Sequence, residues 1–122
     1  MIEAYNIKIL QAAGYDVNNT VEQLGSLDVY NELLNDFYVE NLDRVKKIIA
    51  HKKFMNLADY SVEVHALKSE CMYLGMNELA KKSEEQQFKS EANDIVFINT
   101  HFNEYMTEIA KVMTVLKKYL GK

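Results

Sequence analysis

The feature that most limits the fold of this chain is the spacing of apolar residues in its last third. One face of an α-helix repeats every three to four residues. Apolar residues recur there at these intervals without interruption, as Ile95, Ile98, Phe102, Tyr105, Ile109, Val112, Leu116 and Tyr119. The pattern predicts a long helix over residues 92–120, with Asn93 as its N-cap. Its apolar seam has to be buried against other helices.

Little in the rest of the sequence interrupts helices. Proline is absent and glycine occurs only four times in 122 residues, and these are the two residues that most disfavour a helix interior. No segment alternates polar and apolar residues as a half-buried strand does. Further helices are therefore expected over residues 2–13, 16–24 (capped by Asp16 or Asn18), 26–53, 56–74 and 76–89.

The lengths and connections of these helices predict one all-α domain spanning residues 1–122. Short connections place successive helices antiparallel, so residues 26–120 are expected to form an up-down-up-down antiparallel four-helix bundle. The short N-terminal helices, within residues 1–25, are expected to pack across one end of it. Gly14, Gly25 and Gly75 are the expected helix-ending residues.

The apolar positions of each helix predict its buried face. In 26–53, begun by Ser26 or Asp28, they are Leu27, Tyr30, Leu34, Phe37, Leu42, Val45 and Ile49, with room for a kink near Asn41. In 56–74, capped by Asn56, they are Leu57, Tyr60, Val64, Leu67, Cys71 and Leu74. In 76–89, begun by Met76 or Asn77, they are Leu79, Ala80, Ser83 and Phe88.

Charge and targeting signals narrow the function classes. A net charge of −4 argues against nucleic-acid binding, which needs a basic face, and against adhesion to anionic membranes. The first residues lack the basic and apolar regions of a signal peptide, and no apolar run approaches the ~20 residues of a membrane span. The single cysteine, Cys71, forms no intrachain disulfide and is expected to pack as a small hydrophobe. A cytoplasmic protein is expected.

The usual sequence signatures of enzymes and metal sites are missing. His51, His65 and His101 are far apart in the sequence, and none belongs to a zinc-binding or di-iron pattern. No phosphate-binding loop, dinucleotide fingerprint or nucleophile-elbow serine occurs. We therefore expect neither a resident cofactor nor a metal, and no self-contained hydrolase or kinase.

In the helix expected over residues 56–74, side chains of different kinds are separated around the helix more clearly than packing in a bundle requires. Besides its apolar stripe, the segment 56–74 has an acidic stripe of Asp59, Glu63 and Glu70, well separated from His65 around the helix. The residues nearest His65 are small, apolar or cationic: Ala58, Ser61, Val62, Lys68, Ser69 and Met72. An imidazole on a solvated face is mostly neutral at neutral pH and nucleophilic at nitrogen. The acid-free surroundings suit a group passed between proteins that dock here.

Lys68 and the other residues of this stripe fit that interpretation. Lys68 follows His65 by one helical turn, where a mobile cation could reach an anion attached to the ring. The remaining residues carry little bulk or charge and are the expected docking surface for a partner protein: Ala58, Ser61, Val62, Ser69 and Met72.

The same residues resemble a known family. The segment HALKSECMYLG, from His65 to Gly75, resembles the signature of histidine-containing phosphotransfer (HPt) domains. That signature has a His, an aliphatic residue two on, Lys three on, a small residue four on and a final aliphatic–Gly pair. Upstream, AGYDVNNTVEQLGSLDVYNELLNDF, from Ala13 to Phe37, is similar to the family's first segment and the start of its first long helix. The expected bundle is also the architecture of that family.

The resemblance implies a function. His65 would accept a phosphoryl group from the aspartyl phosphate of one receiver domain and pass it to another receiver. Lys68 would stabilise the phosphohistidine. The implied partners are response-regulator receiver domains and a hybrid sensor histidine kinase, with Mg²⁺ on the receiver and no turnover by this chain. The sequence departs from the usual HPt pattern at three places. Ser69 stands where the family more often has Gly, and Asn56 stands where it usually has Asp. Glu70, Cys71 and Met72 stand where it usually has small residues.

Three other interpretations remain open from the sequence. An HPt-like bundle could hold a receiver without transferring phosphate. It could instead be the phosphoacceptor domain of a chemotaxis-type kinase, labelled from ATP by a separate catalytic domain. An unrelated helical adaptor is the third. Because the internal bundle accounts for the hydrophobic seams, a monomer is expected in each case.

Overall fold

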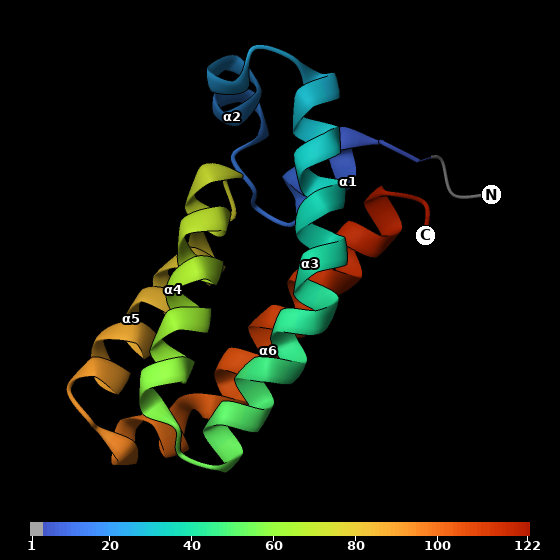
Figure 1. Cartoon of the computed structure of the whole chain (residues 1–122). Coiled ribbons are helices and arrows are strands. Elements are labelled where there is room, and N and C mark those ends of the chain that lie inside the picture. The colour runs from blue at the N-terminus through green and yellow to red at the C-terminus, as the bar shows by residue number, and fades with distance from the viewer. Residues whose placement is uncertain (1–3) are drawn as a thin grey trace.

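The computed structural model describes residues 4–122, which contain six α-helices and no β-strand. Figure 1 shows their arrangement, with two short helices before four longer ones. The helices are α1 (Ile7–Ala12), α2 (Val17–Leu24), α3 (Leu27–Lys53), α4 (Leu57–Tyr73), α5 (Asn77–Glu91) and α6 (Ile95–Tyr119). The all-helical prediction is confirmed.

The four longer helices contact one another in sequence order. α4 packs between α3 and α5, α5 also packs against α6, and α6 contacts α3 (Figure 1). The pair α4–α5 has the most extensive contact, and α3–α6 has the least. Of the short helices, α1 contacts α6 and α2 contacts α3.

Two of the predicted helix starts are confirmed by capping bonds. The side chain of Ser26 accepts a hydrogen bond from the amide of Val29 at the start of α3, and Asn56 accepts from the amide of Asp59 at the start of α4. The prediction for α6 is wrong by one residue. Asp94 is its N-cap and accepts from the amide of Phe97 at 3.0 Å.

The first predicted helix is shorter than expected. It was expected over residues 2–13, but α1 begins at Ile7, after Asn6, whose side chain accepts from the amide of Lys8 at 3.1 Å. Tyr5 has a positive φ of 62°, which is incompatible with a helix running through it. The part of the prediction that covers residues 2 and 3 lies outside the described residues.

The predicted buried face of α4 is confirmed at every position. Its members fill the centre of the core, namely Leu57, Tyr60, Val64, Leu67, Cys71 and Leu74. In α5 the inward positions Leu79, Ala80 and Ser83 are buried, but Phe88 is exposed, contrary to prediction. In α6 the seam is buried except at Ile95, which is exposed, and Phe102, which is half-buried.

The predicted face of α3 is wrong in its second half. Leu42 and Ile49 are exposed, as is Leu27 at the start, and the buried positions are Asn41 and Ile48 instead. α3 continues as one helix through Asn41. The buried amide is satisfied there, because its Nδ2 donates to the carbonyl oxygen of Phe37 at 2.8 Å and its Oδ1 accepts from Arg44 at 3.1 Å.

The turn between α4 and α5 is joined to the N-terminal segment. The amide of Asp16 donates to the carbonyl oxygen of Gly75 at 3.0 Å, and the hydroxyl of Tyr30 donates to that of Leu74 at 3.1 Å. Gly75 has a positive φ of 78°, as expected for a helix-ending glycine. These bonds connect α2, α3 and α4 at the same end of the molecule.

Candidate functional site

His65 lies near the middle of α4 and is exposed to solvent. Its neighbours Val64 and Leu67 belong to the buried stripe, which fixes the rotation of the helix. The ring is therefore directed away from the core by the packing of the residues on either side of it. This is the exposure that the sequence predicts for the histidine.

A residue of α5 holds the ring. Nδ1 of His65 lies 2.9 Å from Oε1 of Gln87. Nε2 of Gln87 donates to Oε1 of Glu91 at 2.9 Å, and the same carboxylate oxygen accepts from the hydroxyl of Ser61 at 3.4 Å. A chain of hydrogen bonds thus runs from α4 to α5 and back to α4.

This chain determines which imidazole nitrogen is free. A carboxylate accepts hydrogen bonds and does not donate them, so the group that Gln87 turns toward Glu91 has to be its NH₂. The carbonyl oxygen of Gln87 then faces the ring and can only accept, so Nδ1 of His65 carries the proton. Nε2 is left unprotonated, with its lone pair available on the exposed ring.

The predicted cation lies on the same helix, and it is half-buried. Lys68 makes no ion pair or side-chain hydrogen bond with any other residue in the range 4–122, so its ammonium group has no competing partner there. One helical turn separates it from His65, a separation at which side chains on a helix surface can meet. Its position allows it to approach a group attached to the ring.

The predicted docking residues differ in exposure. Val62 and Met72 are the large ones, with exposed fractions of 64% and 59%. Ala58 and Ser69 are also exposed, whereas Ser61 is half-buried and bonded to Glu91. Whether they meet a partner stays a prediction.

Two of the three residues of the acidic stripe of α4, Glu63 and Glu70, face α3. Arg44 of α3 binds Glu70 through a guanidinium–carboxylate hydrogen bond, and its Nε lies 3.6 Å from Oε1 of Glu63. Burial, together with a hydrogen bond to the Glu40 carboxyl, raises the pKa of Glu70 above its usual value, although Arg44 acts in the opposite direction. Both carboxylates are therefore held on the side of the helix away from His65.

Two residues of the site escaped the sequence analysis. Gln87 lies 22 positions after His65 and belongs to no short motif, so nothing in the sequence pairs it with the ring. Glu91 brings a carboxylate to Ser61, although the stripe around His65 on α4 has none. The neighbouring helix α5 supplies both residues, and a helical wheel drawn for α4 alone omits them.

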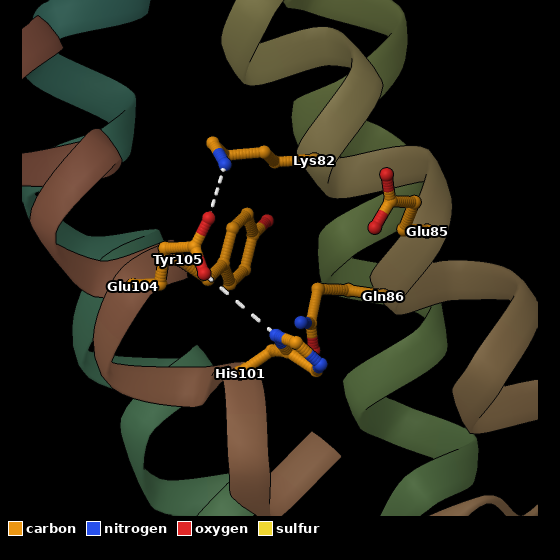
Figure 2. Close-up of a pocket in the computed structure, with 6 residues that line it drawn as sticks. All are labelled: Lys82, Glu85, Gln86, His101, Glu104 and Tyr105. Carbon is orange, nitrogen blue, oxygen red and sulfur yellow. Dashed lines mark hydrogen bonds and ion pairs between the residues drawn. The ribbon is translucent and has the colours of Figure 1, made fainter. Parts of the chain in front are cut away.

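A small pocket between α5 and α6 is separate from this site. Figure 2 shows its lining residues, with Lys82 and His101 on either side of Glu104. Nζ of Lys82 donates to Glu104 at 2.7 Å, and this bond raises the pKa of the lysine and lowers that of the glutamate. The space is about 20 Å³, far below the roughly 300–1,000 Å³ of small-molecule sites. We assign it a structural role.

Outside this site, the described residues show few signs of function. No group of three His, Cys, Asp or Glu side chains within residues 4–122 is placed to hold a metal ion. In the same range, no helix is both long enough and apolar enough to cross a membrane. Burial raises the pKa of the Cys71 thiol, which disfavours the reactive thiolate. Comparison with known protein families, with curated proteins and with solved structures finds no match for this chain.

Proposed function

We propose that this protein is a histidine phosphotransfer protein of a phosphorelay, with His65 as the residue that carries the phosphoryl group. It accepts the group from an aspartyl phosphate on one receiver domain and passes it to a second receiver. It is a phosphocarrier with no turnover of its own. The observation that carries this proposal is the hydrogen bond between His65 and Gln87, because it leaves Nε2 free as a nucleophile.

The transfer step follows from this geometry. The lone pair on Nε2 attacks the phosphorus atom, a P–N bond forms, and the bond from phosphorus to the aspartyl oxygen breaks, so the carboxylate leaves with the electron pair. Nδ1 keeps its proton, and Oε1 of Gln87 accepts that hydrogen bond throughout. The carbonyl dipole stabilises the positive charge that develops on the ring, while Lys68 attracts the phosphoryl oxygens.

The remaining components would come from the partner. A receiver domain, including that of a hybrid sensor histidine kinase, supplies the aspartate and the Mg²⁺ that neutralises the transferring group. This chain supplies a positioned nucleophile and a docking surface on α4, with Val62 and Met72 as its apolar members. We also assign α3–α6 to an up-down-up-down antiparallel four-helix bundle, which the contacts between successive helices support.

A labelling experiment tests the proposal. A receiver domain is phosphorylated with radiolabelled acetyl phosphate and incubated with the protein, and label on the protein is then measured after acid and after base treatment. We expect acid-labile, base-stable label on the wild type and none on His65→Gln. The control is His101→Gln, which changes a histidine of α6 that is outside the site and should leave labelling intact. Label on His65→Gln would refute the proposal.

The same experiment separates the alternatives. Receiver binding that survives in His65→Ala, together with a wild type that takes up no label, identifies a binding module that does not transfer phosphate. Label obtained from ATP with a histidine-kinase catalytic domain, and not from phosphorylated receivers, identifies a phosphoacceptor domain of a chemotaxis-type kinase.

A further inference from the structure

The outer side of α3 has a second seam, which no helix within residues 4–122 covers. Three apolar residues of this seam are about half exposed, with exposed fractions of 52% for Val39, 49% for Leu42 and 44% for Ile49. They belong to a set that recurs every three or four residues along the whole helix: Asp28, Glu32, Asn35, Val39, Leu42, Lys46, Ile49 and Lys53. This is the spacing of a helix-pairing face. Figure 1 shows α3 at the front of the molecule, crossing in front of α6.

A groove adjoins the centre of this seam. Between α3 and α6, which have the least contact among the neighbouring long helices, Leu42 and Val45 line a space of about 220 Å³ together with Met106 and Met113. The lining is predominantly apolar, and methionine side chains adapt readily to the shape of a neighbour. The centre of the seam can therefore receive apolar side chains from outside.

The charges of α3 are completely separated along its length. All of its acidic residues lie between Asp28 and Asp43, and all of its basic residues lie between Arg44 and Lys53. The helix macrodipole favours acids in the first turn and bases in the last turn, but its effect fades within those turns. It therefore does not account for Glu32 or Lys46, which lie further inside the helix.

Several of these charged side chains have no ion-pair partner within residues 4–122, although Nζ of Lys53 lies 5.6 Å from the ring centre of Phe54. Asp43 pairs with Lys47 at 3.4 Å, and Arg44 is bound to α4. By contrast, Glu32, Lys46 and Lys53 form no ion pair with any residue between 4 and 122. A partner that complements the seam needs basic groups at one end and acidic groups at the other. The seam itself, reversed in direction, has that distribution.

We propose that the seam of α3 pairs antiparallel with the same seam of a second copy of this chain. A twofold axis between Val39 and Leu42 places each of these residues opposite the other in the second copy. It places Asp28 opposite Lys53 and Glu32 opposite Ile49, and it brings Lys46 across from Asn35, between Glu32 and Asp36. The result is an apolar centre flanked on both sides by opposite charges, the arrangement that sets register and direction in paired helices.

This dimer leaves the histidine accessible. Arg44 binds Glu63 and Glu70 on the side of α4 that faces α3, whereas His65 is bonded to α5. The expected monomer rested on assigning every hydrophobic seam to internal packing. Leu42 and Ile49, however, are exposed and so remain available for a contact between copies. The dimer does not depend on the proposed phosphotransfer.

Sedimentation of charge variants tests the dimer. One variant makes the acidic end basic (Asp28→Lys/Glu32→Lys/Asp36→Lys), and the other makes the basic end acidic (Lys46→Glu/Lys53→Glu). Each variant alone places like charges opposite each other, so its dimer dissociation constant should rise roughly tenfold or more. An equimolar mixture restores opposite charges at every position and should form a heterodimer. Because mixing cannot repair a misfolded chain, recovery separates loss of pairing from loss of fold.

The control changes the same number of lysines on other helices, as Lys81→Glu/Lys111→Glu, both at exposed positions. It should dimerise like the wild type, which should itself dissociate further as salt is raised from about 0.05 M to about 1 M. A wild type that sediments as a monomer at about 300 µM in low salt, where even weak dimers of this kind are populated, would overturn the proposal. So would a dimer that both charge variants retain.

Discussion

The tautomer of the His65 ring is set by residues outside its own helix. α4 determines that the side chain is exposed, but Gln87 of α5 determines which nitrogen carries the proton, and Glu91 determines which way the Gln87 amide points. A neutral amide is well suited to this role. It fixes the tautomer without placing a further negative charge next to the proposed site of phosphoryl transfer.

Replacing Gln87 by leucine should slow phosphotransfer without abolishing it. The substitution removes the acceptor for the Nδ1 proton, so the free ring populates both tautomers and loses its fixed orientation. We expect the transfer rate to fall roughly fivefold to tenfold, since one such hydrogen bond contributes about 1 kcal/mol. Rapid-quench labelling from a phosphorylated receiver measures the rate.

Nitrogen NMR of the imidazole distinguishes this positioning role from a purely structural one. The wild-type ring should show predominantly the tautomer protonated at Nδ1, and the leucine variant a mixture. Gln87→Glu retains an acceptor for the Nδ1 proton and should retain the tautomer. An unchanged tautomer in Gln87→Leu would contradict the assignment of Nε2 as the free nitrogen.

At this scale the sequence predicts half of the site. The exposure of His65 and the inward packing of Cys71 follow from the helical period of one segment, and both are confirmed. Gln87 could not be found in the same way. Its contact depends on how far α5 is displaced along α4, and side-chain packing between the helices sets that displacement.

Among the elements, α3 and α4 are connected by the contact of Arg44 with Glu70. The contribution of Glu70 to the stability of the protein should depend on pH. The pKa of Glu70 is raised in the folded state, mainly by burial. Between the ordinary carboxyl pKa and this raised value, the folded protein binds more protons than the unfolded chain. The contribution of Glu70 to stability is therefore present at low pH and is lost as pH rises through that interval.

Glu70→Gln removes this titration. The free energy of unfolding of the variant, relative to the wild type, should therefore increase as pH is raised from about 4 to about 7. Urea denaturation followed by circular dichroism across that range measures the difference. A difference that stays constant with pH would mean that the carboxyl titrates alike in the folded and unfolded states.

The helices also show where a periodic pattern fails. All apolar positions of α4 were assigned correctly because no polar residue interrupts its buried stripe. In α3 the buried position 41 is an asparagine, which the apolar pattern passes over in favour of Leu42, and Ile49 follows two turns later in the same wrong register. Hydrogen bonds to Phe37 and Arg44 make the buried amide tolerable, and these bonds cannot be inferred from hydrophobicity.

For the molecule as a whole, the start of α2 is fixed to the rest of the fold at Gly75. A Cβ added at this residue would lie 2.5 Å from Oγ1 of Thr20 and 2.9 Å from the carbonyl oxygen of Asp16. Its φ of +78° is also unfavourable for a residue with a side chain. The segment before α3 is thus held by a contact that tolerates no extra atom.

Gly75→Ala should therefore destabilise the protein more than a comparable change elsewhere. Gly25 provides the matched control, since its φ is +92° but a Cβ there meets nothing within 4 Å. We expect a loss of about 1 kcal/mol for Gly25→Ala, from the backbone alone, and of about 2–4 kcal/mol for Gly75→Ala. Thermal unfolding of both variants measures the difference. Equal losses would show that α2 can move away from the turn at little cost.

The hydrogen-bond chain between α4 and α5 also has a consequence for changes of chain length. One residue inserted in a helix rotates everything beyond it by about 100°. An insertion in α5 between the Met76 turn and Gln87 would therefore carry the amide away from His65, even if every original side chain were retained. An insertion after Glu91, in the connection to α6, would leave the amide in place. Length variation in this protein should thus be tolerated on one side of the site and not on the other.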